Sequence, residues 1–200
     1  MEQRIPHSSD KKATARRQAR AARQSLDDQT RVQASADICH RVSQHPCFQQ
    51  ATHIAGYLPL KYEVDLRPLL SLAITQHKKV WIPRVIDRNM TFAAYHPDHP
   101  LTRSAVGTQQ PSEDAQTQDA RGIDLALLPL LAFTRSGIRL GLGGGYYDRA
   151  FSFMLQEPAS AGPQLTGTAF AIQETDTLPR DSWDVPLQHI VTQRGWTTCR

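Results

Sequence analysis

The glycine-rich segment Gly141 to Gly145 constrains the fold of this chain more than any other feature. It holds four of the 11 glycines within five positions. Because glycine has no Cβ, such a loop adopts backbone conformations that other residues avoid, and a ligand can approach its amides closely. Successive N–H groups in a loop of this kind form an anion-binding concavity. Arg139 and Arg149 flank the loop with positive charge, and the carboxylate of Asp148 suits a hard metal ion.

The segments around the loop favour a phosphate site. The apolar run 123–133 precedes it, and a helix is expected over 146–156. A strand, a glycine loop and a helix in this order place phosphate at a helix N-terminus. The glycines do not match the Walker pattern, since no Lys-Ser or Lys-Thr follows them, and they read GxGGG rather than GxGxxG. The residues therefore indicate a nucleotide phosphate site and leave a structural tight turn as the alternative.

Length and cysteine content exclude several classes of protein. The 200 residues suit one domain. No membrane span is predicted, because the sequence has no run of about 18 apolar residues. Cys39, Cys47 and Cys199 are odd in number and lack CxxC spacing, which argues against a disulfide framework or a structural zinc site. A reducing cytoplasm is the expected location.

The N-terminal segment is strongly basic. Residues 11–23 carry six Lys or Arg and no acidic residue, and Lys12, Arg16, Arg20 and Arg23 recur at a spacing that places them on one helix face. Charge alone favours a solvated basic face, while a phosphate clamp and nucleic-acid binding remain alternatives. Base stacking by this segment is not expected, because no Phe, Trp or Tyr precedes position 48.

Hydrophobic patterning predicts an α/β fold. A disordered leader is expected over 1–10 and a single α/β domain over 11–200, with an exposed loop at 107–121. Expected helices are 11–24, 25–43 (opened by a capping box from Ser25 to Asp28), 65–77 and 146–156, and expected strands are 53–58, 79–86, 90–95, 123–129, 165–172 and 189–192. Such alternation implies a mainly parallel sheet covered by helices, with ligands at the carboxyl ends of its strands. The glycine loop lies beyond the carboxyl end of the strand 123–129.

The segment from Pro129 through Ala132-Phe133 to Gly137-Ile-Arg-Leu-Gly-Leu-Gly-Gly-Gly-Tyr-Tyr-Asp148 resembles the signature of the 5-formyltetrahydrofolate cyclo-ligase family, also called 5,10-methenyltetrahydrofolate synthetases. Weaker similarities follow in the family's order over nearly the whole chain, at 12–16, 57–65, 80–84, 90–92, 173–186 and 190–192. The chain departs from the usual family pattern at Thr134, Gln110, Leu142 and Arg180. The fold implied is a three-layer, Rossmann-like, mainly parallel sheet flanked by helices (NagB/RpiA/CoA-transferase-like).

The resemblance implies an ATP- and Mg²⁺-dependent reaction that converts 5-formyltetrahydrofolate into 5,10-methenyltetrahydrofolate, ADP and phosphate. Phosphorylation of the formyl oxygen activates the formyl carbon, which N10 then attacks to close the ring. We expect a cytoplasmic monomer whose partners are ATP and 5-formyltetrahydrofolate, with no nucleic acid and no membrane.

Residue roles carry over from the family by position. ATP binding is implied for Lys12, Arg16, Arg139, Leu140, Gly141, Leu142, Gly143, Gly144, Gly145, Tyr146 and Tyr147. Folate binding is implied for Leu58, Glu63, Leu142, Gly143, Gly144, Gly145 and Tyr146. The expected Mg²⁺ ligands are Asp148 and Asp184, and Arg139, Tyr146 and Arg149 are the expected catalytic residues.

Several of these residues have structural alternatives. Asp184 is also interpretable as a turn residue, and Glu63 as an exposed loop carboxylate. Packing is the favoured role of the Tyr147 ring, and a core or rim position that of Trp183. Two other functions also remain open: a nucleotide- or RNA-binding regulatory protein that uses the basic N-terminal helix, and an enzyme resembling the sugar-phosphate isomerases.

Overall fold

A central sheet organises the part of the chain that the computed structural model describes, residues 8–104, 107–156 and 162–199. Its eight strands follow the order β12-β11-β10-β7-β1-β2-β3-β6. The five strands from β11 to β2 are parallel, while β12, β3 and β6 join the two edges antiparallel. The strands are β1 (His53–Ala55), β2 (Lys79–Ile86), β3 (Asn89–Ala94), β6 (Thr117–Gln118), β7 (Leu125–Pro129), β10 (Gln164–Thr168), β11 (His189–Thr192) and β12 (Gly195–Thr198). The predicted mainly parallel sheet is confirmed.

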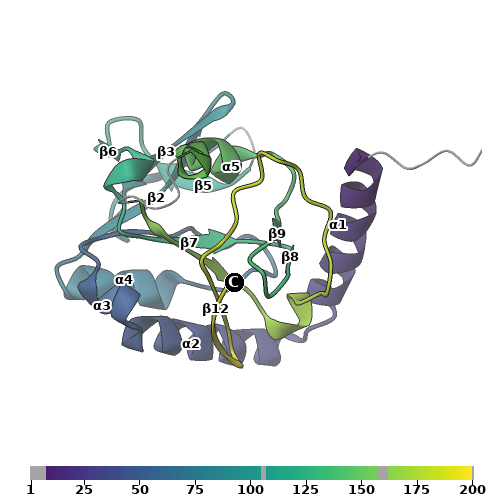
Figure 1. Ribbon diagram of the computed structural model, residues 1–200. Coiled ribbons are helices and arrows are strands. Elements are labelled where there is room, and N and C mark those ends of the chain that lie inside the picture. Colours follow the sequence, from purple (N-terminus) through teal and green to yellow (C-terminus); the bar gives the residue numbers. More distant parts are fainter. Residues whose placement is uncertain (1–7, 105–106, 157–161, 200) are drawn as a thin grey trace, which may run out of the picture.

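Side chains that alternate along the buried strands build two separate cores. In β7, Leu125 and Leu127 belong to one core, and Ala126 and Leu128 to the other. The first face of the sheet is covered by α2 (Asp28–Gln44), α3 (Pro46–Gln50) and α4 (Arg67–Thr75), and the second by α5 (Tyr146–Ala150) and the 3₁₀ turn η2 (Ser152–Leu155). Figure 1 shows the first group below the sheet and α5 above it, so the molecule has the three layers predicted.

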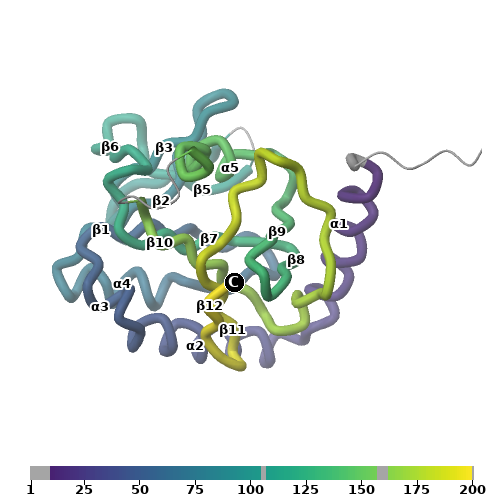
Figure 2. The backbone as a smooth tube through the Cα atoms, viewed as in Figure 1, coloured from purple at the N-terminus to yellow at the C-terminus, as the bar shows by residue number. Residues whose placement is uncertain are grey.

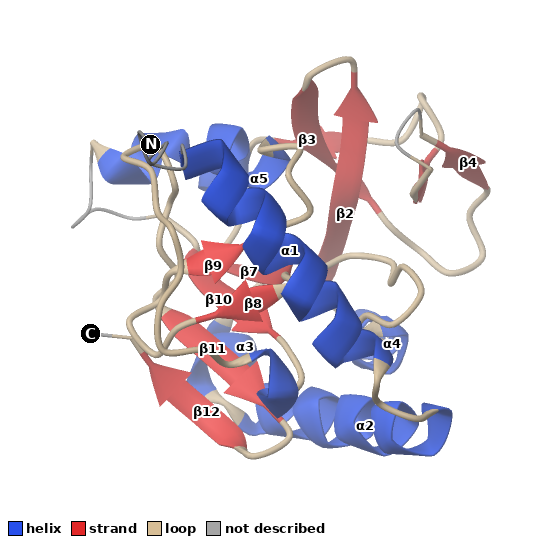
Figure 3. Ribbon diagram, turned by 90° about the vertical axis from the view of Figure 1, so that its right-hand side faces the viewer, coloured by secondary structure: helices blue, strands red, loops and turns tan. Residues whose placement is uncertain are grey.

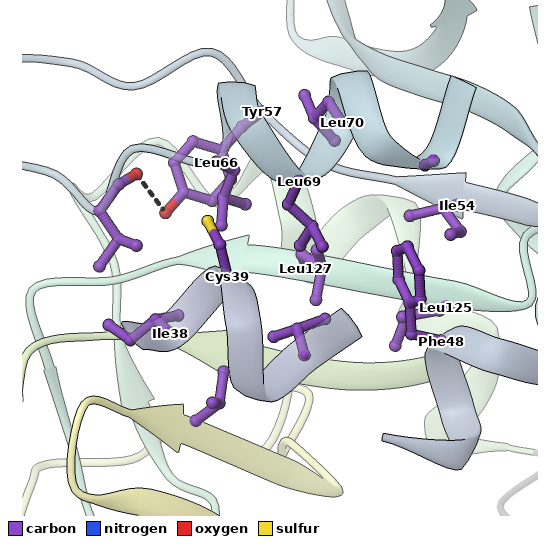
Figure 4. Close-up of a cluster of buried hydrophobic side chains, with 14 of the residues drawn as sticks. Ile38, Cys39, Phe48, Ile54, Tyr57, Leu66, Leu69, Leu70, Leu125 and Leu127 are labelled. Atoms are coloured by element: carbon purple, nitrogen blue, oxygen red, sulfur yellow. Dashed lines mark hydrogen bonds between the residues drawn. The ribbon is translucent and has the colours of Figure 1, made fainter. Parts of the chain in front are cut away.

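The core under α4 is apolar and densely packed. Leu69 and Leu70 of α4 are buried together with Leu125 and Leu127 of β7, and Figure 4 shows Leu69 next to Leu127 and Phe48 next to Leu125. Truncation of a leucine at this depth typically costs about 2–5 kcal/mol. This core therefore fixes the loop between β1 and α4, which carries two of the predicted folate-binding residues.

The predicted helix over 146–156 was wrong in length. The α-helix α5 ends at Ala150, and the chain continues as the 3₁₀ turn η2. Phe151 separates the two elements because its ring is fully buried, with its centroid 5.7 Å from that of Phe92. An α-helix of five residues has too small a dipole to bind phosphate by itself, so the phosphate argument depends on the loop amides and the neighbouring cations.

Three other local predictions also need correction. The second helix is capped by Asp27, whose side chain accepts a hydrogen bond from the Thr30 N–H, rather than by a box from Ser25 to Asp28. The strand predicted over 165–172 ends at Thr168, because the chain then turns into η3 (Ala171–Gln173). The segment 107–121 is not wholly an exposed loop: it contains β5 (Gln109–Pro111), β6 and η1 (Ala120–Gly122), whose short backbone pairings need no apolar periodicity.

Two small hairpins extend from the main sheet towards the predicted site. β8 (Ala132–Phe133) pairs with β9 (Arg139–Leu140), so this hairpin stands between β7 and the glycine loop that was predicted to follow β7 directly. β4 (Leu101–Arg103) pairs with β5, and Figure 3 shows β4 to the right of β2 and β3.

Helix α1 (Ser8–Gln24) crosses the carboxyl ends of the parallel strands and does not pack on either face of the sheet. In Figure 3 it runs diagonally in front of β7 to β10, and Figure 2 shows it beside the C-terminal part of the chain. The helix begins at Ser8, so the predicted disordered leader was wrong for residues 8–10, and residues 1–7 lie outside the described part. Among the described helices, none combines the length and the apolar character that a membrane span requires.

Candidate active site

A cavity of about 1020 Å³ opens at the carboxyl edge of the sheet. Pro129, the last residue of β7, lies at its base, and Tyr57 and Leu58 line it just beyond β1. Helix α1, the glycine loop, the arm formed by β4 and β5, residues of β2 and β3, and the segment 181–184 supply further parts of the wall. The position agrees with the expectation that ligands bind at the carboxyl ends of parallel strands.

The glycine loop lines this cavity along its whole length, 141–145. Two positions require glycine: Gly143 has φ of 111° and Gly145, the N-cap residue of α5, has φ of 66°. Side chains rarely adopt these values, so the loop depends on glycine for its course. Leu142, at its tip, is 45% exposed.

Arg139 anchors the base of the loop. Its guanidinium donates to the main-chain oxygen of Val185 and, at 2.6 Å, to Oδ1 of Asp148. Only 6% of the Arg139 side chain is exposed. Burial lowers the pKa of Arg139, and the charges of Asp148 and Asp184 act in the opposite direction. The geometry therefore gathers both predicted metal ligands around one buried cation.

Lys12 joins α1 to the C-terminal segment of the cavity wall. Its ammonium lies 2.8 Å from Oδ2 of Asp181 and 2.5 Å from Oδ2 of Asp184. Burial alone would lower the pKa of Lys12, but hydrogen bonds and charge from the two aspartates raise it above its ordinary value. Lys12 thus brings one fixed positive charge to the cavity.

Arg16, one helical turn later, reaches the glycine loop. Its Nε donates to the main-chain oxygen of Gly141 at 3.0 Å. Arg23 forms a buried ion pair with Glu63, whereas Arg20 is exposed. The solvated basic face that charge alone favoured was therefore wrong for Lys12 and Arg23.

A hydrogen bond from the backbone of Val185 brings Asp148 close to Asp184. The N–H of Val185, the neighbour of Asp184, donates to Oδ1 of Asp148 at 3.2 Å. Among the described residues, no group of three or more His, Cys, Asp or Glu is placed to hold a metal ion. Two carboxylates with phosphate and water are a donor set that Mg²⁺ accepts. Asp148 and Asp184 therefore fit a magnesium ion whose other ligands come from a bound phosphate group and water.

The remaining predicted residues of this segment take different positions. The Tyr146 hydroxyl is 3.5 Å from the Asp87 main-chain oxygen, and Arg149 donates from Nε and Nη2 to the oxygen of Arg88. Both residues line the cavity and also attach the loop to the turn between β2 and β3. The Tyr147 ring packs near Phe151, with centroids 6.4 Å apart, as the packing role predicted.

Glu63 also lines the cavity, from the loop between β1 and α4 that carries Leu58. Only 5% of its side chain is exposed, so the alternative of an exposed loop carboxylate was wrong. Its Oε2 accepts the Leu60 N–H at 2.9 Å, and its Oε1 lies 3.4 Å from Nη1 of Arg23. Burial raises the pKa of Glu63, while the Leu60 amide and Arg23 act to lower it.

Sequence reasoning missed several residues of the cavity wall. Asp181 completes the cluster around Lys12, and Thr108 and Gln109 line the cavity from the β4–β5 arm. Asp181 is three positions before Asp184, a spacing that would have indicated a shared turn. Gln110 accepts the Val85 N–H through its side-chain oxygen, so this departure from the family pattern braces β2.

Trp183 lies on the cavity wall with 64% of its surface exposed, which agrees with the rim position expected for it. A ligand that excludes water there should change the indole emission. We expect addition of Mg-ADP to shift or quench the tryptophan fluorescence of the protein. Trp183→Phe should abolish the response and Trp196→Phe should retain it, because Trp196 lies in β12, away from the cavity. Loss of the response in the Trp196 variant alone would contradict this placement.

Comparison with known proteins identifies the family of this chain. The model of the "5-formyltetrahydrofolate cyclo-ligase family" matches residues 8–193. The chain belongs to this family. Among its relatives, the 5-formyltetrahydrofolate cyclo-ligase of Escherichia coli (strain K12) is 29% identical over 177 residues, covering 86% of this chain and 95% of the relative. The Haemophilus influenzae enzyme of the same name is 32% identical over 147 residues, covering 72% and 76%.

Solved structures agree with the fold. The structure of Aquifex aeolicus 5,10-methenyltetrahydrofolate synthetase matches with a TM-score of 0.81 at 28% identity, covering 94% of this chain and 93% of that protein. The Mycoplasma pneumoniae synthetase matches with a TM-score of 0.71 at 25% identity, covering 91% and 98%. The predicted family, enzyme class and α/β fold are confirmed.

Proposed function

We propose that the chain catalyses the ATP- and Mg²⁺-dependent conversion of 5-formyltetrahydrofolate into 5,10-methenyltetrahydrofolate, with release of ADP and phosphate. The observation that carries the proposal is the composition of the cavity. The loop glycines and the cations Lys12, Arg16 and Arg139 line the cavity, and so does the buried carboxylate of Glu63. The cations match the negative charge of a triphosphate, and the carboxylate matches the amino and N–H donors of a reduced pterin.

The loop 139–147 binds the phosphates of ATP in this proposal. The loop and Arg16 line the cavity, and Lys12 and the buried Arg139 supply fixed charge. Donors that are held in place before the reaction stabilise developing charge without reorganising. One such donor typically lowers the activation barrier by about 2.7–4 kcal/mol. Arg149 and Tyr146 are placed at the same loop, where they orient it against the β2–β3 turn.

Asp148 and Asp184 would hold the magnesium ion. When bound, Mg²⁺ neutralises charge on the triphosphate and orients its terminal phosphoryl group. Oδ1 of Asp148 and Oδ2 of Asp184 already accept bonds from Arg139 and Lys12. Each carboxylate would hold the ion while it keeps its bond to the neighbouring cation.

The folate lies towards Leu58 and Glu63, with Leu142 and the loop glycines between the two substrates. The carboxylate of Glu63 suits the amino and N–H groups of a reduced pterin, which are hydrogen-bond donors. Leu58 supplies apolar contact from the same segment.

The chemistry then needs mainly alignment of the two substrates. The formyl oxygen attacks the terminal phosphorus, the bond to the bridging oxygen breaks, and ADP leaves. N10 adds to the activated carbon, the carbon–oxygen bond breaks, phosphate leaves, and N10 releases its proton. Alignment of reactants in one site is worth up to about 7–11 kcal/mol in favourable systems.

An absorbance assay tests this proposal. Purified protein with ATP, Mg²⁺ and 5-formyltetrahydrofolate should generate the near-ultraviolet band of the methenyl product, with one ADP formed per product. Chelation by EDTA should abolish turnover, and added Mg²⁺ should restore it. Product formation in excess EDTA would remove the metal from the proposal, and no product at high enzyme concentration would contradict the proposed function itself.

Nucleic-acid binding gains no support from the structure. Lys12 and Arg23, which that alternative requires on the surface, are buried in ion pairs.

A further inference from the structure

The buried ion pair between Arg23 and Glu63 extends the site beyond the cavity wall. Arg23 lies on α1, and Glu63 lies in the loop between β1 and α4, 40 positions later. Only 8% of the Arg23 side chain and 5% of the Glu63 side chain are exposed. The pair lines, with Tyr57, Thr168 and Gln173, a recess that has no room for a water molecule. A cation and an anion buried at this depth act as a unit, because loss of either leaves an uncompensated charge.

The backbone around Glu63 is held in a tight turn. The Glu63 N–H donates to the Leu60 oxygen at 3.0 Å, and the Leu60 N–H donates back to Oε2 at 2.9 Å. Tyr62 between them has φ of 70°, a left-handed backbone conformation that residues other than glycine rarely adopt. The turn therefore fixes one carboxylate oxygen, and Arg23 is placed against the other.

We propose that Arg23 is a positioning residue for the folate site, which keeps the Glu63 carboxylate ionised and turned towards the cavity so that it can accept hydrogen bonds from the pterin. Arg23 does not line the main cavity, whereas Glu63 lines both the cavity and the recess. Arg23 thus acts on the substrate through Glu63. The proposal rests on the proposed function, since it concerns the folate end of the same site.

The charge balance around Glu63 gives the sign of the expected pH effect. Burial raises the pKa of Glu63, and Arg23 acts to lower it. The other titratable groups that interact with Glu63 are Tyr57 and Tyr147, whose own pKa values are raised by burial, so both stay neutral. Without Arg23 the pKa of Glu63 rises further, and the ionised form is lost at a higher pH as the solution is acidified.

Arg23→Met tests the proposal, with Arg20→Met on the exposed face of the same helix as the matched control. We expect Arg23→Met to raise the KM and the Kd for 5-formyltetrahydrofolate about tenfold or more, the loss expected for a charged hydrogen bond. The KM for ATP should change far less. The acid limb of kcat/KM for folate should move to higher pH in Arg23→Met and stay in place in Arg20→Met.

Rescue and a double-mutant cycle separate positioning from a merely structural role. Arg23→Lys keeps the charge and should return the acid limb to that of the unsubstituted protein. In a background of Glu63→Gln, the further change Arg23→Met should have little additional effect on the Kd for folate, because the two residues act as a unit. If Arg23→Met does not fold, Arg23→Gln carries the same test, since it removes the charge and keeps a donor.

Two results would overturn the inference. One is an equal rise in the KM for ATP and for folate with an unmoved acid limb, which would make Arg23 a structural residue only. The other is full additivity of the two substitutions. If the unsubstituted protein neither binds nor converts 5-formyltetrahydrofolate, it is the proposed function that fails, and the inference fails with it.

Discussion

Replacement of Arg139 by methionine is expected to destabilise the protein and to abolish most of its activity. The guanidinium donates to the Val185 oxygen and to Oδ1 of Asp148, so its loss removes both bonds and leaves the Asp148 carboxylate without its paired cation. Breaking a buried ion pair by removing one partner costs about 3–5 kcal/mol. Because 25% of the Asp148 side chain is exposed, we expect the lower end of that range. Urea denaturation followed by circular dichroism measures the change in the free energy of unfolding.

Arg135→Met is the matched control, in the turn that precedes β9. Its partner Glu174 lies 2.5 Å away, but 80% of the Arg135 side chain is exposed, so water replaces the lost contact. This variant should keep nearly the stability and the turnover of the unsubstituted protein. Equal losses in the two variants would contradict the view that burial of Arg139, rather than pairing alone, stabilises the loop.

The helical periodicity of α1 was informative, but the sequence did not show which way the helix faces. At about 100° per residue, Lys12, Arg16 and Arg23 lie within about 40° of one another, and Arg20 lies about 80° from Lys12. The three clustered cations are those that contact other segments, while Arg20 is exposed. Their partners lie 40 to 172 positions away along the chain. Local spacing therefore identifies a face, and only tertiary contacts show that it is directed towards the site.

The central strands of the sheet could be predicted from the local hydrophobic pattern, because strands buried on both faces consist almost wholly of apolar residues. The run Leu125–Pro129 is apolar on both faces, as a central parallel strand requires. The short pairings of β5 and β6 had no such pattern, since their backbone hydrogen bonds are satisfied against β4 and β3 with few buried side chains. The end of α5 also depended on a distant contact, the burial of Phe151 against Phe92.

The candidate site shows the same division. The glycine loop, Arg139 and Asp148 are neighbours in sequence, and their proximity could be predicted from the motif. Asp181 and Trp183 line the cavity in a segment that is distant from α1 in the sequence, and the ion pair between Lys12 and Asp181 joins the two. The resemblance supplied Glu63, whereas its burial against Arg23 required the fold.

Gly143→Ala is expected to impair ATP use more than folate binding. With φ of 111°, Gly143 holds a conformation that alanine adopts only under strain, at a cost of roughly 1–3 kcal/mol. A Cβ at this position would also lie 3.3 Å from Cζ of Arg16, so the contact that joins α1 to the loop would have to shift. We expect the KM for ATP to rise about tenfold, equivalent to about 1.4 kcal/mol of lost binding. Steady-state kinetics with each substrate varied in turn measures the difference.

Gly141→Ala separates backbone strain from substitution in the loop as such. Gly141 has no positive φ, and a Cβ there meets nothing within 4 Å. Its thermal stability should therefore match that of the unsubstituted protein, while Gly143→Ala melts at a lower temperature. If both variants melt alike and the KM for ATP is unchanged in Gly143→Ala, then the left-handed turn at Gly143 does not hold the loop in its phosphate-binding form. The nucleotide would then have to be sought at another part of the cavity wall, and Trp183→Phe, read by Mg-ADP titration, would locate it.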